Sequence, residues 1–534
     1  MKKIIYIIFA IIFISCAAFF KSDEKLINYV DPFIGSGGHG HVFVGANVPF
    51  GGVQVGPTNF NKGWDWSSSY HHTDSIVKGF CHINVSGTGM SDLGELTIMP
   101  ATGDLKTGAG TQQNHMAGYS SLYRKNKEFA TAGYYKVHLE RYDIDVELTA
   151  TERVGLHNYI FPEAEKSRII IDLGEGSADR PTETYIKKVN DTLFEGHRFS
   201  TGWARDQREY FSLIISKPVS DFIIYDRHKK FKGIERKGDY VKGFLEFSTE
   251  KDEKIMVKMG ISTVSSKNAL ENMMIELPHW DFERVKKNAE EKWENELAKI
   301  KIKTKDKKKK RVFYTAMYHT MIAPNLYHDL NGEYRGTDKV VYKDSSFTNY
   351  TLFSLWDTYR AAHPLYTITH PERVSDFVNS MIKIYEHQGK LPVWHLRGNE
   401  TNTMPGYSGI PVVIDAALKG FDNIDLEKVF EAAKVSATGD FEPGVKDLME
   451  RGYIPADFMV ESVASNMEYA IGDWGIAQLA KKLGKNEDYE YFLNRSKAYK
   501  QYFDPETRFM RGKLSDGSWR TPFDPISAEH RVND

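Results

Sequence analysis

The chain has 534 residues, which is too long for one ordinary domain and predicts two or three. Hydrophobic residues make up 41% of it and charged residues 27%, a balance that is typical of globular proteins and excludes a disordered chain. The formal net charge of −2 at pH 7 gives no electrostatic reason to expect nucleic acid as a partner.

The first residues have the shape of a secretory signal. Lysines precede an apolar run over residues 4–14, and Cys16 follows a small residue. A bacterial lipoprotein processing site leaves such a cysteine as the lipidated N-terminus. We therefore expect residues 1–21 to be a lipoprotein-type signal segment and the chain to be exported and lipid-anchored in the bacterial cell envelope, facing the periplasm or the cell surface. The alternative is an uncleaved anchor, because the apolar run through Phe20 is almost long enough to span a bilayer.

Residues 25–265 are predicted to form a β-sandwich. Short stretches of alternating polarity are separated by turn residues and have no helix between them, which is typical of this architecture. The predicted strands cover residues 134–139, 146–151, 156–161, 168–173, 210–216, 243–247 and 255–262.

Residues 270–534 are predicted to be helical. Apolar residues recur there at spacings of three and four and indicate roughly eight helices. The helices are expected within residues 282–302, 305–318, 352–359, 374–388, 412–419, 426–433, 463–483 and 492–503, with Pro364 ending the third and Gly389 the fourth. Loops rich in Trp and carboxylates join them, which suggests helical hairpins arranged in a ring. The basic run Lys305–Arg311 is interpreted as a solvated surface.

Two glycine-rich stretches stand out in the β-rich part. In Asp31–Phe50, His39 and His41 are two residues apart and could share a strand face. No third ligand is evident, so turn histidines lining a pocket are favoured over a zinc site. In Gly63–Gly94, Trp64 stands in a GWDW segment. That stretch is either a hairpin with a packed tryptophan or one wall of a sugar site at the domain junction.

The stretch Leu352–Met404 combines aromatic, carboxylate and amide side chains at predicted helix ends. Such a combination suits a sugar pocket, because aromatic rings cover the apolar face of a sugar and polar groups take its hydroxyls. Glycoside hydrolysis requires two carboxyl groups flanking the bond. Spacing does not say which two face each other, and most carboxylates on helices are solvated or paired. The candidates are Asp357, Glu400, Glu461, Glu468 and Asp473.

Long motifs occur from about Val30 to the last residue. They include VDPFIGSGGHGHVFVGANVPFG, GWDW, SGTGMSDLG, TMIAPNLY, SLWDTYRAAHPL, GKLPVWHLRGNETNTM, RGYIP, EYAIGDW, FDPETRFMRGK and TPFDP. In these the chain resembles glycoside hydrolase family 92, the calcium-dependent exo-α-mannosidases. The resemblance implies an N-terminal β-sandwich, a C-terminal (α/α)6 toroid and inverting hydrolysis of terminal α-mannosides in glycan degradation. In that chemistry an acid protonates the leaving oxygen while a base activates water on the opposite face.

The resemblance also implies roles for individual residues. Asp357, in SLWDT, matches a family position that binds the terminal mannose, and Trp64 matches a tryptophan that the sandwich contributes. Asn399 and Glu400 match the family segment G-N-E-T and are expected to line the pocket. Mannose-containing glycans are therefore the expected partners, together with a membrane reached through the lipid on Cys16.

Three segments of the family are missing from the sequence. They are T-E-G-N with the acid, H-G-N-E-P with the calcium ligands and G-N-x-D-x-G-Q with the base, and in the family they follow the TPFDP region. We therefore expect the catalytic residues and the calcium ligands beyond Asp534, the last residue, and assign none within the chain. The expected protein is a C-terminally truncated member with an incomplete (α/α)6 toroid.

Two alternatives to a truncated mannosidase stay open. The first is a catalytically inactive glycan-binding surface lipoprotein. The second, another sandwich-plus-toroid hydrolase or phosphorylase acting on an α-glucoside, fits the motifs less well.

Overall fold

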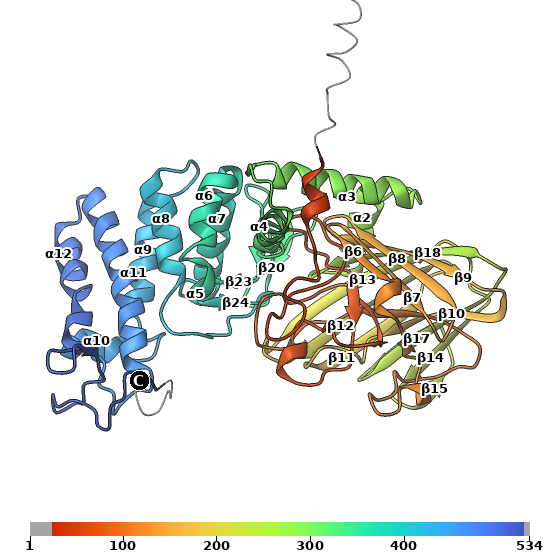
Figure 1. Ribbon diagram of the computed structural model, residues 1–534, viewed down its shortest axis with the longest axis horizontal. Helices are drawn as coiled ribbons and strands as arrows, with labels where there is room; N and C mark the ends of the chain where they lie inside the picture. The colour runs from red at the N-terminus through yellow and green to blue at the C-terminus, as the bar shows by residue number, and fades with distance from the viewer. Residues whose placement is uncertain (1–23, 528–534) are drawn as a thin grey trace, which may run out of the picture.

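The computed structural model describes residues 24–527. The predicted signal segment with Cys16 therefore lies outside the described residues, and so does Asp534, beyond which the catalytic groups are predicted. Antiparallel strands up to Ser262 form a β-sandwich, and from Ser266 the chain is mainly helical (Figure 1). Within residues 24–527, helices α6 to α9, α11 and α12 stand side by side in a row that leads away from the sandwich and does not close into a ring. The predicted fold class, a β-sandwich followed by an incomplete (α/α)6 toroid, is confirmed.

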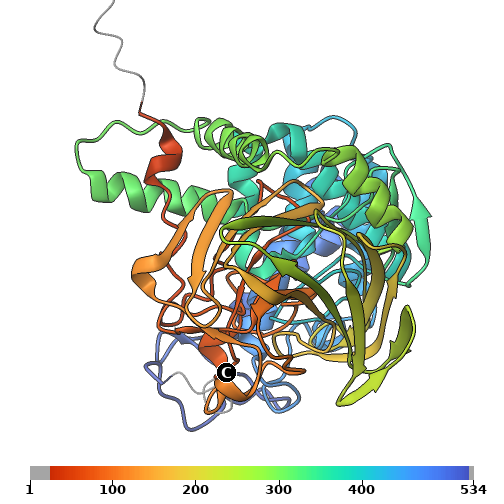
Figure 2. The ribbon, with the colours of Figure 1, turned by 90° about the vertical axis from the view of Figure 1, so that its right-hand side faces the viewer.

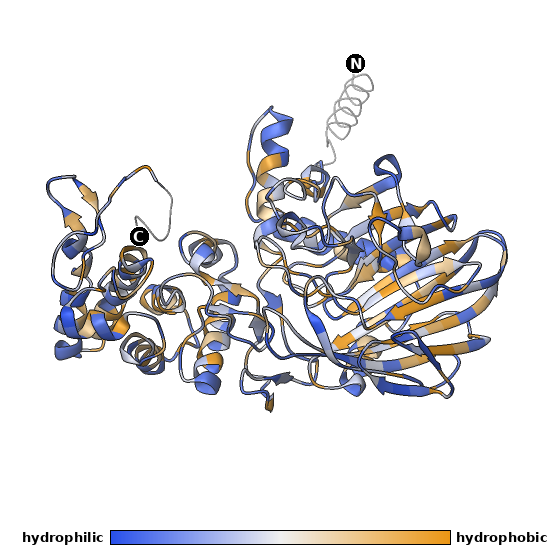
Figure 3. Ribbon diagram, turned by 90° about the horizontal axis from the view of Figure 1, so that it is seen from below, coloured by the Kyte–Doolittle hydropathy of each residue, from blue (hydrophilic) through white to orange (hydrophobic). Residues whose placement is uncertain are grey.

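The sandwich consists of two antiparallel sheets whose inner faces share one hydrophobic core. The seven-stranded sheet has the order β1 (Gly56–Thr58), β3 (Gly79–Cys81), β4 (Thr97–Thr102), β10 (Ala164–Asp172), β17 (Val241–Thr249), β14 (Asp221–Asp226) and β15 (Lys229–Phe231). The nine-stranded sheet has the order β16 (Glu235–Gly238), β11 (Arg180–Lys188), β12 (Leu193–Thr201), β13 (Gln207–Ile215), β18 (Glu253–Ser262), β9 (Val154–Phe161), β8 (Ile144–Ala150), β7 (Tyr134–Leu139) and β6 (Glu128–Thr131). Hydrophobic and hydrophilic stretches alternate along these strands (Figure 3).

All seven predicted strands are present, but the sequence missed several others, including β4, β11, β12 and β14. The reason is clearest in β12. Its inward positions are Phe194, Gly196, Arg198 and Ser200, so one side of the strand is buried without being uniformly hydrophobic. A pattern based on hydropathy does not detect a strand that buries an arginine.

The structure has eleven α-helices within the described residues, against roughly eight predicted. They are α2 (Ser266–Glu276), α3 (Phe282–Leu297), α4 (Lys307–Thr320), α5 (Leu355–Thr358), α6 (Ala362–Thr369), α7 (Pro371–Gln388), α8 (Gly409–Lys419), α9 (Leu426–Thr438), α10 (Val445–Arg451), α11 (Ser462–Lys482) and α12 (Asn486–Arg495). The sequence missed α2, α6 and α10. None of the helices within residues 24–527 is long and apolar enough to cross a bilayer.

Two helix predictions were wrong in their bounds. Residues 352–359 form only the four-residue α5, because Leu352 has a left-handed φ of 58° and β23 (Phe353–Ser354) pairs with β24 (Trp394–His395). Pro364 does not end a helix but lies in the first turn of α6, where its missing N–H is not needed. By contrast, Gly389 ends α7 with a φ of 84°, as predicted.

The predicted last helix, residues 492–503, is also divided. It separates into the end of α12 and a 3₁₀ turn, η5 (Ala498–Tyr502). The other short ladders pair β2 (Ile76–Val77) with β5 (Ser121–Leu122), β19 (Asn325–Leu326) with β22 (Tyr350–Thr351), β20 (Glu333–Arg335) with β21 (Val341–Lys343), and β25 (Phe503–Asp504) with β26 (Phe509–Met510).

The sandwich and the helical part pack against each other in more than one place. Helix α2 and the start of α3 cover the outer face of the nine-stranded sheet, where Met273 and Phe282 join a small core with Leu156. The N-terminal 3₁₀ turn η1 (Leu26–Tyr29) packs into the core of the helical part. Trp293 Nε1 donates a hydrogen bond of 2.8 Å to the backbone oxygen of Asn47. The junction is therefore a continuous interior and not a flexible linker.

Candidate functional site at the domain junction

The loop that follows β24 is held open in a strained shape at the junction. Arg397, Asn402 and Met404 have left-handed φ values of 45°, 50° and 78°. The Glu400 carboxylate accepts hydrogen bonds from the backbone N–H groups of Val393, Trp394 and Asn402, each at 2.9 Å. Three amide donors fix a carboxylate firmly. Glu400 therefore organises the loop, and its predicted contact with sugar stays a prediction.

A buried ion pair attaches this loop to the sandwich. Arg397 binds Glu209 of β13 through both Nε and Nη2, with 2.8 Å between Nη2 and Glu209 Oε2. The side chains are 4% and 1% exposed, so neither charge has water to solvate it. Burial raises the pKa of Glu209 even though the Arg397 guanidinium acts against the rise. The pair is thus a fixed connection between the two domains.

Both the oxygen and the nitrogen of the Asn399 side-chain amide form hydrogen bonds at the junction. Its Oδ1 accepts from the Asp206 N–H at 3.0 Å and from Lys339 Nζ at 2.9 Å. Its Nδ2 donates to the backbone oxygens of Leu396 and Arg397 at 3.2 and 3.0 Å. Burial lowers the pKa of Lys339 to about 8. Asn399 is buried and fully bonded, so the structure gives it a positioning role, and its predicted contact with sugar is not tested by these bonds.

A second tryptophan contact completes the attachment. Trp203, in the β12–β13 turn, donates from Nε1 to Thr403 Oγ1 at 2.9 Å, and its ring centroid lies 4.4 Å from that of Trp394. The sandwich therefore shapes a loop that belongs to the helical part of the chain. The sequence did not indicate this role for Trp203, Glu209 or Lys339.

Trp64 is an exposed aromatic residue of the sandwich. It starts the 3₁₀ turn η2 (Trp64–Trp66) and is 57% exposed. The rings of His41 and His39 lie 4.3 and 5.1 Å from it, centroid to centroid. A Cβ atom on Gly89 would lie 2.4 Å from Trp64 Nε1, so a glycine is needed to seat the indole. Such a ring, supported at its edges and open to solvent, can stack on a sugar.

The two interpretations of the GWDW segment each apply to one tryptophan. Trp66 is packed: its ring stacks on His71 with 4.3 Å between centroids, and its Nε1 donates to Asp74 at 3.0 Å. Between the two rings, Asp65 accepts from His39 Nδ1 at 2.6 Å. His39 and Asp65 thus form a polar edge beside the exposed ring.

Asp357 lies on α5, next to the strained loop because β23 and β24 pair. It is exposed, and Ser354 Oγ donates to its Oδ2 at 2.5 Å. Of the candidate carboxylates whose bonds the structure gives, Asp357 is the least engaged, which suits a group that receives sugar hydroxyls. The structure places Asp357, Asn399 and Glu400 in one region, whereas the ring contacts of Trp64 are with residues of the sandwich.

Two other candidate carboxylates have structural partners. Glu468 accepts from Trp356 Nε1 at 3.1 Å, Tyr359 Oη at 2.7 Å and Arg360 Nη2 at 2.6 Å. Asp473, on α11, is buried. Its carboxylate accepts hydrogen bonds from Arg495 Nη2 at 2.5 Å, from Arg495 Nε at 2.7 Å and from the Tyr407 hydroxyl at 2.5 Å. These two carboxylates hold helices together. Glu461 precedes α11 at the N-cap position, in a left-handed conformation with a φ of 63°.

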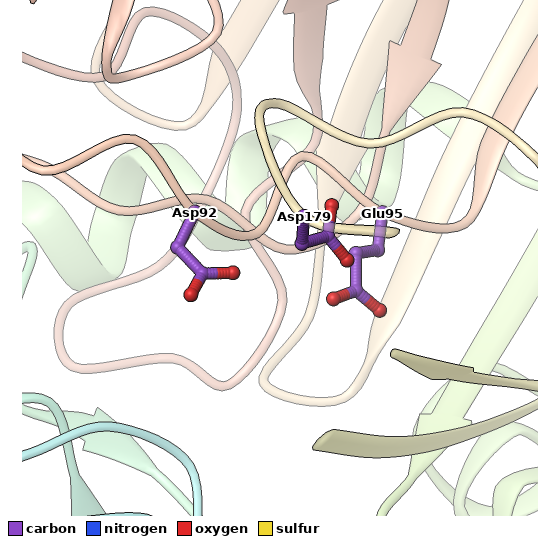
Figure 4. A group of neighbouring side chains, drawn as sticks. All are labelled: Asp92, Glu95 and Asp179. Atoms are coloured by element: carbon purple, nitrogen blue, oxygen red, sulfur yellow. The ribbon is translucent and has the colours of Figure 1, made fainter. Parts of the chain in front are cut away.

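One acidic group within residues 24–527 has the spacing of a metal site: Asp92, Glu95 and Asp179, whose ligand oxygens lie within 4.8 Å of one another (Figure 4). It does not fit calcium. Arg198 Nη1 lies 3.1 Å from Glu95 Oε2 and 2.5 Å from Asp179 Oδ2, so a guanidinium already supplies the positive charge. Burial also raises the pKa of Glu95 well above its usual value and that of Asp92 to about 6. Calcium instead takes about six to eight ionised or carbonyl oxygens.

The catalytic groups and the calcium ligands that the resemblance places beyond Asp534 stay a prediction. The described residues end at Ser527, before that point, so the structure neither supports nor contradicts it.

Family models match both parts of the chain. The N-terminal domain model of glycosyl hydrolase family 92 covers residues 29–262, and the catalytic domain model of the same family covers residues 268–533. Among curated proteins, an uncharacterized secreted glycosidase of Arthroderma benhamiae is 25% identical over 557 residues, covering 93% of this chain. The chain spans 64% of that relative's length.

Solved structures agree with the family models. A family GH92 α-mannosidase from Bacteroides thetaiotaomicron in complex with mannoimidazole is 38% identical, with a TM-score of 0.92. The match covers 94% of this chain and 67% of that one. A family GH92 inverting mannosidase from the same organism is 26% identical with a TM-score of 0.87, and the match covers 96% and 70% of the two chains.

Proposed function

The chain belongs to glycoside hydrolase family 92. We therefore propose that it is the substrate-binding part of an exo-α-mannosidase and binds terminal α-mannosides. The observation that carries this proposal is the match to an α-mannosidase in complex with mannoimidazole over 94% of the chain. The exposed ring of Trp64 and the exposed carboxylate of Asp357 supply the two chemistries that a sugar requires, a stacking surface and a hydroxyl acceptor.

We propose that these residues position the terminal sugar for inverting hydrolysis. The ring of Trp64 would cover the apolar face of the mannose, while Asp357 would accept hydrogen bonds from its hydroxyls. Asn399 and Glu400 would fix the pocket wall through their bonds to the loop backbone. Inversion requires an acid and a base on opposite faces of the sugar, about 6.5–9.5 Å apart. Family resemblance further suggests that the whole protein uses calcium to bind two sugar hydroxyls.

The second candidate function is glycan binding without catalysis. It is favoured by the engagement of Glu400, Glu468 and Asp473 in structural hydrogen bonds, which leaves these carboxylates unsuited to act as acid or base. We propose that the 534-residue chain binds α-mannosides and does not hydrolyse them by itself, and that the acid, base and calcium ligands of the whole protein come from the family segments missing from this sequence.

We also propose that the protein is exported and anchored through a lipid on Cys16. The apolar run followed by Ser15 and Cys16 supports the anchor, and a curated relative described as a secreted glycosidase supports export. Mannose-containing glycans outside the cytoplasm are then the proposed substrates.

Calorimetric titration with a methyl α-mannoside tests the proposed function. We expect binding by the unaltered chain and a loss of about 1–3 kcal/mol of binding free energy in Trp64→Ala, because the stacking surface is removed. The matched control is Trp474→Ala on α11, a tryptophan of similar exposure, 54%, that is not among the predicted sugar-binding residues. Asp357→Asn should weaken binding as well. Equal affinity in Trp64→Ala and Trp474→Ala would refute the assignment.

A parallel assay separates the two candidate functions. Release of mannose from α-mannosides is measured with and without added calcium. We expect none from the 534-residue chain. Release that requires calcium would show that acid, base and metal ligands lie within it, and would replace the binding function with catalysis.

A further inference from the structure

A run of lysines lies on the surface beside the point where the described chain begins. Within residues 301–309, of sequence KIKTKDKKK, Asp306 is the only acidic residue. We call the following side chains the basic surface: Lys301, Lys303, Lys305, Lys307, Lys308 and Lys309. All six are exposed, and the first five take part in no ion pair among residues 24–527. The remaining one, Lys309, has only a long contact of 3.8 Å with Asp306.

The backbone presents these lysines outward as an ordered feature. Between α3 and α4, the half-buried Ile300 and Ile302 pack on the helical core. The Tyr314 hydroxyl donates to the Ile300 oxygen at 3.3 Å and accepts from the Ile302 N–H at 3.2 Å. Burial alternates along residues 300–305, so the isoleucines face inward while Lys301, Lys303 and Lys305 are exposed.

Helix stability does not explain the rest of the basic surface. Lys307, Lys308 and Lys309 occupy the first turn of α4, and that turn contains no acidic residue. A helix N-terminus carries a partial positive charge, so each cation there is unfavourable by a few tenths of a kcal/mol. Asp306 caps the helix by accepting from the Lys308 and Lys309 N–H groups at 3.0 and 3.2 Å. Within residues 301–309, Asp306 is therefore the one acidic group that offsets the positive charge of Lys307, Lys308 and Lys309, and helix stability does not require that charge.

The N-terminal end of the described chain is fastened to the same place. The Glu294 carboxylate accepts from the N–H groups of Leu26 and Ile27 at 3.0 and 2.9 Å. Lys310 Nζ lies 4.6 Å from the ring centroid of Tyr29. In both Figure 1 and Figure 2, η1 lies against α3 and α4 where the chain enters the fold. Leu26 follows Cys16 by ten positions, a span of at most about 35 Å.

We propose that the basic surface binds the anionic phospholipid headgroups of the membrane to which Cys16 tethers the chain. The proposal rests on the lipid attachment proposed above. A lipid on Cys16 holds the chain at a membrane surface, and a basic cluster next to a lipid anchor is attracted to anionic headgroups by about 1 kcal/mol for each Lys or Arg. The tether keeps the basic surface within reach of the bilayer, where screening lengths of about 8–10 Å make close approach necessary.

The proposed contact also orients the sugar site. In Figure 1 the entry of the chain and α3 lie along the top of the molecule, whereas α5 and β24 lie below α6 and α7, at about mid-height. Asp357 lies on α5, and β24 leads into the strained loop. A bilayer against the basic surface would therefore lie apart from α5 and β24 and leave this region accessible to glycans.

The test uses the full chain purified from membranes, after mass spectrometry of its N-terminal peptide has established acylation. A fluorophore is attached at Lys301→Cys, which is exposed, whereas Cys81 is buried. Quenching by a headgroup spin-labelled lipid is measured in vesicles of phosphatidylcholine alone and with about 30% phosphatidylglycerol. We expect the ratio of quenched to unquenched label to be about tenfold higher in the anionic vesicles, and the difference to vanish in ~1 M NaCl.

Charge-reversal variants test whether the lysines of the basic surface make the membrane contact. In Lys305→Glu/Lys308→Glu/Lys309→Glu the excess quenching in anionic vesicles should be lost. Thermal stability should be kept, because glutamates suit the first turn of α4. The matched control reverses three exposed lysines around β15, Lys229→Glu/Lys230→Glu/Lys232→Glu, and should quench like the unaltered chain.

The outcomes separate the two proposals. Equal quenching in both vesicle types, or loss of quenching in the β15 control as well, overturns the membrane contact. Retention on a nucleic acid without quenching in anionic vesicles also overturns it. If the N-terminal peptide carries no lipid but the unacylated chain still shows excess quenching that depends on the basic surface, the lipid attachment fails and the membrane contact stands.

Discussion

Removing one partner of the Glu209–Arg397 pair should destabilise the junction strongly. In Glu209→Gln, the Arg397 guanidinium keeps its charge but loses its counter-charge and one of its two acceptor oxygens, and with 4% exposure it cannot recruit water. Breaking a buried pair in this way costs about 3–5 kcal/mol. For a cooperative unit of about 150–250 residues, that is a fall in Tm of roughly 6–20 °C.

Scanning calorimetry checks this prediction against a matched control in the same sheet. Glu195→Gln on β12 breaks an exposed pair with Lys187, 3.6 Å long, and should change the stability by less than about 1 kcal/mol. Replacing both partners, as in Glu209→Leu/Arg397→Met, should recover much of the loss because no lone charge stays buried. A Tm of Glu209→Gln within about 2 °C of Glu195→Gln would show that water or rearrangement solvates Arg397, and would refute the reasoning.

Two further predictions concern the pH dependence of stability and the position of the Trp64 indole ring. Burial lowers the pKa of His82 to about 4, below the 6.5 of an exposed histidine, so the unfolded chain binds more protons between these values. The stability that neutral His82 contributes is therefore present above about pH 6.5 and is lost as the pH falls toward 4. Over this range, the Tm of His82→Gln should fall less steeply with decreasing pH than the Tm of the unaltered chain. Parallel curves of Tm against pH for the two proteins would contradict the assignment. Gly89→Ala places a Cβ atom 2.4 Å from Trp64 Nε1. It should weaken α-mannoside binding by about fivefold or more in calorimetric titration, as expected for loss of a stacking contact of about 1 kcal/mol or above. Gly108→Ala, which meets nothing within 4 Å, is the control, and unchanged binding in both variants would show that the indole position does not matter.

Local patterns determined much of the fold. Helix α7 was predictable because Val374, Phe377, Met381 and Ile384 repeat along one face and Gly389 supplies the left-handed cap. Strand β7 coincides with the predicted residues 134–139 because its buried positions are hydrophobic and alternate. In both cases the periodicity of the element and the periodicity of burial are the same.

The predictions failed where an element depends on a distant partner. The apolar spacing from Leu352 to Tyr359 suits a helix, yet its first residues pair with β24, about 40 positions away. The short helices α2, α6 and α10 gave no sustained pattern. Arg198 on β12 is buried only because the carboxylates of Glu95 and Asp179 meet it from other segments.

The same division applies to the candidate site. Residue types and long motifs predicted a sugar pocket that includes Trp64 and Asp357, and the structure leaves both exposed. They did not predict that Glu209, 188 positions before Arg397, would hold the neighbouring loop. A hydrogen bond across the junction leaves no periodic trace in either segment, because its partners come together only when both domains have folded.

The sequence by itself therefore determined the family, the order of the two domains and the chemistry of the predicted sugar site, since these follow from motifs and local periodicity. The tertiary structure decided which carboxylates are engaged in packing, which tryptophan is open to solvent, and that a lysine run lies beside the entry of the chain. Each of these depends on burial and on contacts between segments far apart in sequence, which only the folded chain brings together.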